Sequence, residues 1–264
     1  MIELHTKAEI EAMKPAGEFV AATLTALKER ARIGVSLLEL DEFAHELIRT
    51  RGAESCYLDY APSFGSGPFG YVLCTSVNDA VLHGKPTSYR LEDADLLSLD
   101  FAASVDGWVA DSAISFTVGT PRHKDLELIR LTEQALDAAI AVAHVGNRIG
   151  DISHAIGTVA HAAGIPVNRE FGGHGVGRTM HGDPHVANDG RSGRGYPLRP
   201  GLVIAIEPWF MRGTDRLRID PDGWTLRSAT GSRTAHSEHT IAITEDEPIV
   251  FTDRGQGAPA TQPR

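Results

Sequence analysis

Alternation of apolar and polar positions is clearest over residues 96–118, on either side of the dipeptide Asp106-Gly107. An Asp-Gly pair between two such runs is the strongest short-range signal for a β-hairpin with a two-residue turn. With that turn, Asp100 and Asp111 become diagonal neighbours on one face, about 7–8 Å apart at the backbone. The other residues of this face are small or polar, whereas the opposite face carries large apolar side chains that predict a core.

Apolar residues recur at helical spacing in four segments, two in each half of the chain. These predicted helices span residues 7–30, 36–52, 124–144 and 151–163. The second pair repeats the spacing of the first, so that Gly34 corresponds to Gly146 and Gly52 to Gly164. The repetition predicts two related halves, each built from two helices followed by strands.

Two more predicted strands, residues 202–208 and 238–244, each place one glutamate on a face of otherwise small residues. These glutamates are Glu207 and Glu238. With the two aspartates of the hairpin, four strands carry one carboxylate each. Four acids that converged in one sheet would repel one another strongly unless cations lay between them.

A glycine-rich stretch over residues 171–185 contributes histidines in place of acids. Four carboxylates and the imidazole of His174 form an oxygen-rich donor set that suits divalent ions such as Mn²⁺, Co²⁺, Fe²⁺ or Zn²⁺. Two such ions about 3.5–4 Å apart can share and deprotonate a water and hold both ends of a hydrolytic transition state. The predicted ligands are Asp100, Asp111, His174, Glu207 and Glu238.

Composition narrows the classes of protein to consider. The net charge of −10 argues against a nucleic-acid partner, which would need a basic surface. No apolar run approaches the roughly 18 residues of a membrane span, and the first residues do not form a signal peptide. Two cysteines, Cys56 and Cys74, favour a reducing, cytoplasmic setting. We expect one domain over residues 1–251 and a disordered tail over residues 252–264.

Six motifs together make the chain similar to a type I methionine aminopeptidase, over about residues 2–251. They are NDAVLHGKP (78–86), LSLDFAASVDGWVADSAISFTVG (97–119), GGHGVGRTMHGDPHV (172–186), LRPGLVIAIEP (198–208), DGWTL (222–226) and SEHTIAIT (237–244). The resemblance implies the α+β pita-bread fold, a curved antiparallel sheet flanked by helices. It also implies two pseudo-symmetric halves, residues 7–119 and 122–251, in agreement with the internal repetition.

The resemblance carries the metal ligands of the family onto the same five residues. It implies that Asp111 and Glu238 bridge two metal ions, that Asp100 completes one, and that His174 and Glu207 complete the other. A bridging hydroxide would attack the first peptide carbonyl, with Glu207 as the proton shuttle.

The remaining implied roles belong to the substrate. His181 would polarise the carbonyl or stabilise the oxyanion, and His83 would contact the scissile amide. The methionine side chain would enter an apolar pocket formed by Phe69, Cys74, Met180 and Trp224. From the residues alone, simple core packing explains Cys74 and Trp224 equally well.

The implied activity is removal of the N-terminal methionine from nascent proteins and peptides, with a small second residue. The expected enzyme is a cytoplasmic monomer with no membrane or nucleic-acid partner and only transient ribosome association. Two alternatives stay open: an X-Pro dipeptidase or aminopeptidase of the same fold, and an inactive pita-bread binding protein. The short segment before Asp100 disfavours the first, and the complete set of five ligands disfavours the second.

Overall fold

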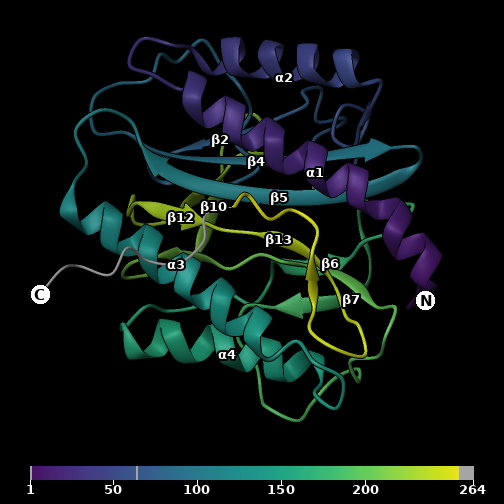
Figure 1. Ribbon diagram of the computed structural model, residues 1–264. Helices are drawn as coiled ribbons and strands as arrows, with labels where there is room; N and C mark the ends of the chain where they lie inside the picture. Colours follow the sequence, from purple (N-terminus) through teal and green to yellow (C-terminus); the bar gives the residue numbers. More distant parts are fainter. Residues whose placement is uncertain (1, 64, 256–264) are drawn as a thin grey trace, which may run out of the picture.

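The computed structural model describes residues 2–63 and 65–255, with helices arranged in two pairs (Figure 1). The helices are α1 (Lys7–Arg30), α2 (Leu37–Arg51), α3 (His123–Ala141) and α4 (Ile149–Ala162). All four predicted helices are present, with ends shifted by a few residues. Thr6 and Ser36 form capping boxes that satisfy free amides at the starts of α1 and α2.

A long hairpin crosses the middle of the molecule (Figure 1). Its strands, β4 (Leu96–Val105) and β5 (Trp108–Thr117), pair antiparallel along their whole length. Both residues of the Asp-Gly turn have positive φ, 52° and 74°, as a type I′ turn requires. The ladder places Asp111 opposite Ala102 and Asp100 opposite Ala113, which confirms the predicted hairpin and its register.

Two larger sheets and two small ones contain the strands. The sheet of the first half has the order β1-β4-β2, with β5 also on β4, and that of the second half the order β14-β13-β8-β6-β7. The small sheets are β10-β11-β3 and β12-β9. Bounds not yet given are β1 (Glu54–Ser55), β2 (Cys74–Val77), β3 (Ala80–Leu82), β6 (Gly172–Gly175), β7 (Gly182–Ala187), β8 (Val203–Ile206), β9 (Trp209–Met211), β10 (Leu217–Ile219), β11 (Leu226–Ser228), β12 (Thr234–His236), β13 (His239–Ala242) and β14 (Ile249–Val250).

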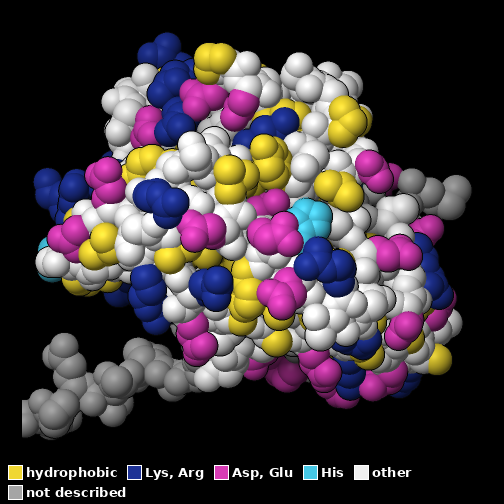
Figure 2. Space-filling model, turned by 90° about the horizontal axis from the view of Figure 1, so that it is seen from above, with side chains coloured by type: hydrophobic (Ala, Val, Ile, Leu, Met, Phe, Trp, Pro, Cys, Tyr) yellow, Lys and Arg dark blue, Asp and Glu magenta, His cyan; other side chains and the backbone are white. Residues whose placement is uncertain are grey.

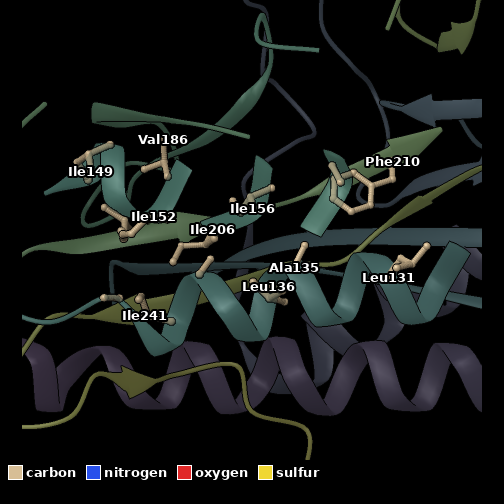
Figure 3. Close-up of a cluster of buried hydrophobic side chains, with 14 of the residues drawn as sticks. Leu131, Ala135, Leu136, Ile149, Ile152, Ile156, Val186, Ile206, Phe210 and Ile241 are labelled. Carbon is tan, nitrogen blue, oxygen red and sulfur yellow. The ribbon is translucent and has the colours of Figure 1, made fainter. Parts of the chain in front are cut away.

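Separate hydrophobic clusters attach each helix pair to its sheet. In the first half, α1 and α2 pack on the apolar face of the hairpin through residues such as Leu24, Leu40 and Phe101. In the second half, Ile152 and Ile156 of α4 meet side chains of α3, β8 and β13 (Figure 3). The helices therefore cover one face of each sheet and leave the carboxylate-bearing residues on the other.

The predicted strand over residues 202–208 corresponds to β8, which ends two residues early, at Ile206. Pro208 has no amide hydrogen to donate to a ladder, and a separate strand, β9, begins at Trp209. Glu207 therefore lies at the break between the two strands.

The end of the described chain corrects one prediction. Disorder was expected from Thr252, but this residue is fully buried and its hydroxyl accepts a hydrogen bond from the amide of Thr240 at 3.2 Å. Arg254 donates a hydrogen bond to a serine of β5 at 2.7 Å. The prediction is wrong for residues 252–255, because β5 and β13 supply partners that composition does not reveal. The rest of the predicted tail, 256–264, lies outside the described residues.

Figure 2 shows the face of the molecule above α2, where acidic and basic side chains lie intermingled. Within the described part of the chain, no helix combines the length and apolar character that crossing a bilayer requires.

Candidate metal centre and active site

Hydrogen bonds between the two halves bring the first pair of predicted ligands together. The amide of Glu238 donates to the carbonyl of Ala113 at 3.0 Å, which joins the start of β13 to β5. The hydroxyl of Thr240 accepts from the amide of Asp111 at 2.9 Å and donates to its carbonyl at 2.7 Å. Asp111 and Glu238, which are distant in the sequence, thus become neighbours.

All five predicted ligands line one cavity of about 290 Å³, here called the central cavity. Ligand atoms of Asp111, His174 and Glu238 all lie within 4.8 Å of one another. His174 Nε2 is 3.6 Å from Glu207 Oε1 and 3.8 Å from Asp111 Oδ2. Asp100 joins the group through Tyr57, whose hydroxyl contacts both aspartates.

The donor set fits a divalent metal. Glu238 is 2% exposed, and its Oε1 has no hydrogen-bond partner among the described residues. A buried carboxylate oxygen without a donor is costly, and a cation would offset that cost. The Nδ1 atom of His174 is 3.1 Å from the carbonyl of Gly175, which leaves Nε2 directed at the carboxylates as a metal-binding imidazole requires.

The electrostatics of the central cavity also call for positive charge. Burial, with a smaller effect from Asp100, raises the pKa of Glu207 to about 8. Burial and then repulsion from Asp100 and Glu207 raise the pKa of Asp111 well above its usual range. The pKa of Glu238 is raised in the same way, by burial first and its acidic neighbours second. A bound cation reverses this balance and favours the ionised carboxylates.

The structure places His83 and His181 on the wall of the same cavity. Burial lowers the pKa of each to about 4, so both imidazoles are neutral near pH 7. The ring of His181 lies 4.1 Å from that of His174 and stacks on Tyr60 at 5.1 Å, measured between ring centroids. A neutral imidazole can donate one N–H to a substrate oxygen, the chemistry expected of both residues.

The predicted side-chain pocket is the apolar end of the central cavity. Phe69, Cys74, Met180 and Trp224 all line it, and each is at least nine-tenths buried. The rings of Phe69 and Trp224 meet edge to face at 5.1 Å. These residues also form a hydrophobic cluster, so Cys74 and Trp224 are part of the core as well as of the cavity wall, and their contact with a substrate stays a prediction.

Tyr57 is the residue that the sequence analysis missed. Its hydroxyl donates to Asp100 Oδ1 and lies 3.1 Å from Asp111 Oδ1. Burial, followed by the two aspartates, raises the pKa of Tyr57 well above its usual range, so the phenol keeps its proton. The strand just before Tyr57, β1, has two residues. A strand this short shows no periodic pattern from which the direction of the Tyr57 side chain could be predicted.

His236 is a second buried group beside the centre. Its Nε2 lies 3.8 Å from Glu207 Oε2 and 3.9 Å from Glu238 Oε2. An imidazole at this distance from two carboxylates can hold a metal ligand in orientation.

Comparison with known proteins gives consistent matches. The model of metallopeptidase family M24 matches residues 11–245. A methionine aminopeptidase of Clostridium perfringens is 42% identical over 254 residues, which are 96% of this chain and 99% of the relative. Methionine aminopeptidase 1 of Mycobacterium tuberculosis is 42% identical over 261 residues, 96% of this chain and 95% of that protein.

Among solved structures, a methionine aminopeptidase also resembles this chain more than a prolidase does. The crystal structure of a methionine aminopeptidase from Thermotoga maritima superposes with a TM-score of 0.90 at 36% identity, covering 96% of this chain and 99% of the other. A prolidase from Pyrococcus furiosus reaches a TM-score of 0.72 at 22% identity and is covered over 65% of its length. The second likeness shows a shared fold only.

Proposed function

Since this chain belongs to metallopeptidase family M24 and matches methionine aminopeptidases over nearly their full length, we propose that it removes the N-terminal methionine of nascent proteins and peptides. Its fold is the α+β pita-bread fold, and its chemistry is hydrolysis that depends on divalent metal. The observation that carries the proposal is the buried carboxylate and imidazole cluster, which opens directly into an apolar pocket.

The proposed ligand assignment is the one that the resemblance to the family implies. Asp111 and Glu238, whose ligand atoms lie within 4.8 Å of that of His174, would be shared by two divalent ions of Mn, Co, Fe or Zn. Asp100 would complete the binding of one ion, and His174 with Glu207, 3.6 Å apart, would complete the binding of the other. When bound, such ions supply Lewis-acid polarisation of a carbonyl and lower the pKa of water.

The chain's own residues position the substrate and move protons. The first side chain enters the apolar end of the cavity beside Phe69 and Trp224, and the free α-amino group lies toward Asp100. Only the first residue of a peptide can meet both demands, which explains an exopeptidase. Neutral His181 donates its N–H to the carbonyl oxygen that becomes negative, and His83 contacts the scissile amide. Glu207 takes a proton from water and returns it to the leaving nitrogen.

Restriction to a small second residue has a steric reason. The wall past the scissile bond carries His181, which Tyr60 holds by stacking. A large side chain at the second position would meet this pair. Monomeric state, cytoplasmic location and transient ribosome contact remain predictions.

A direct comparison of two peptides tests the proposed activity. The metal-depleted protein is reloaded with Mn²⁺ or Co²⁺ and given Met-Ala-Ser and Gly-Pro peptides in separate reactions. We expect release of free methionine from the first and little cleavage of the second. Preferential cleavage of the Gly-Pro peptide would favour the X-Pro alternative, and no cleavage with no bound metal would favour an inactive binding protein.

A further inference from the structure

The hydroxyl of Tyr57 lies between two of the proposed metal ligands. It donates to Asp100 Oδ1 and is also within 3.1 Å of Asp111 Oδ1. The other oxygen of Asp111, Oδ2, is the one near His174, at 3.8 Å from its Nε2. The two oxygens of Asp111 thus face different groups: one faces the imidazole, and the other faces the phenol and Asp100.

A cation shared by Asp100 and Asp111 would take an oxygen from each aspartate. The phenol contacts one oxygen of each, Asp100 Oδ1 and Asp111 Oδ1. An ion that used these two oxygens would compete with the hydroxyl for them.

We propose that the Tyr57 hydroxyl competes with a divalent ion for Asp100 and Asp111, and so sets the affinity of the Asp100 side of the metal centre. The inference rests on the proposed metal centre and deepens it. The proton of the phenol stands in for a cation by satisfying both carboxylates. Within the described part of the chain, this hydroxyl forms hydrogen bonds with the two aspartates and not with His174 or Glu207.

The backbone around Tyr57 keeps the ring in place. Ser55 pairs with Ala103 in the ladder between β1 and β4, and the amide of Tyr57 donates to the hydroxyl of Ser55 at 3.2 Å. The ring meets Phe69 edge to face at 5.9 Å, and the residue is 6% exposed. Because packing holds the ring in place, the hydroxyl stays beside the two aspartates.

Metal titration of the chelated protein with Mn²⁺, followed by calorimetry, tests this role independently of peptidase activity. Tyr57→Phe removes only the hydroxyl. Since a hydrogen bond to a charged group no longer has to be broken, we expect the weaker of two binding steps to tighten roughly tenfold or more, with the tighter step unchanged. Tyr57→Leu, which also lacks the hydroxyl, should shift the same step in the same direction.

Tyr89→Phe is the matched control. It removes another phenol that donates to an aspartate, Asp95, at 2.8 Å, away from the central cavity, and should leave both steps as in the parent protein. A second step that is unchanged or weaker in both Tyr57 variants would overturn the role of Tyr57, even with two ions bound. Failure of the parent and all variants to bind Mn²⁺ would overturn the proposed metal centre as well.

Discussion

Buried like charges dominate the chemistry at the scale of single residues. Asp111 and Glu238 are each less than a twentieth exposed and lie within reach of two other acids. Burial raises the pKa of each carboxyl group, and repulsion from neighbouring acids, Asp100 and Glu207 among them, raises it further. Such an arrangement is unfavourable for folding by itself, and the binding of cations is what compensates for it.

Replacing a proposed bridging ligand should abolish activity. Asp111→Asn keeps the shape of the side chain and removes the negative charge that a shared ion requires. We expect methionine release to fall at least about a hundredfold and the bound metal, measured by atomic emission, to fall with it. Asp137→Asn on the outer surface of α3 is the control and should behave like the parent protein. Normal turnover by Asp111→Asn would show that the bridge is assigned to the wrong residue.

His181→Ala separates a substrate contact from a metal ligand. The imidazole lies beside His174 but is not among the groups that cluster as ligands in the described chain. We expect turnover to drop by about a hundredfold or more, as for loss of an oxyanion donor, while metal content stays normal. His174→Ala should instead lose metal, so equal losses of metal in both variants would contradict the assignment.

At the scale of elements, the link between β5 and β13 positions the site. The hydroxyl of Thr240 both accepts from and donates to the backbone of Asp111, and the residue is fully buried. This one side chain replaces the ladder hydrogen bonds that would otherwise join the two strands at this point. The separation of the carboxylates of Asp111 and Glu238, the proposed bridging ligands, therefore depends on it.

Thr240→Val should loosen that link. Valine keeps the shape but leaves two backbone groups of Asp111 without a partner, at a cost of about 1–3 kcal/mol. Urea unfolding of the metal-free protein measures this loss of stability. Metal binding should also weaken, so that half-saturation requires a higher metal concentration. Thr158→Val removes an exposed hydroxyl on α4 that donates to the carbonyl of His154, and should change neither quantity. Equal stability of the two variants would contradict the role of Thr240.

At the scale of the whole molecule, we infer one domain, because the cavity is built from both halves. The described C-terminal segment strengthens this connection behind the metal centre. Arg254 donates to the hydroxyl of Ser112, which in turn donates to the carbonyl of Glu238 at 2.6 Å. Through Ser112, Arg254 is thus linked to the backbone of Glu238, one of the proposed metal ligands.

Two truncations test the contribution of this segment. A chain that ends after Gly255 keeps all the contacts described for Thr252 and Arg254, whereas one that ends after Phe251 loses them. We expect the shorter chain to be less stable by about 2 kcal/mol or more in urea unfolding, since several buried hydrogen bonds are lost. Arg254→Gln should reproduce part of the loss. Identical stability of the two truncated chains would show that residues 252–255 do not stabilise the fold.

Local patterns allowed much of the site to be predicted. The Asp-Gly turn fixed which residues of the hairpin share a face, so the aspartates could be placed without any tertiary information. The glutamates and His174 were selected by their position on faces of small residues or among glycines. Tyr57 could not be found this way, because its neighbours form no periodic pattern.

The order of apolar and polar residues by itself determined the helices, the hairpin register and the identity of the residues with metal-binding chemistry, because these depend on repeats of a few residues. Tertiary structure alone decided how Asp111 meets Glu238, how the end of the chain packs behind them and where the Tyr57 hydroxyl lies. Those contacts join residues far apart in the sequence, and their distances follow from the packing of whole elements.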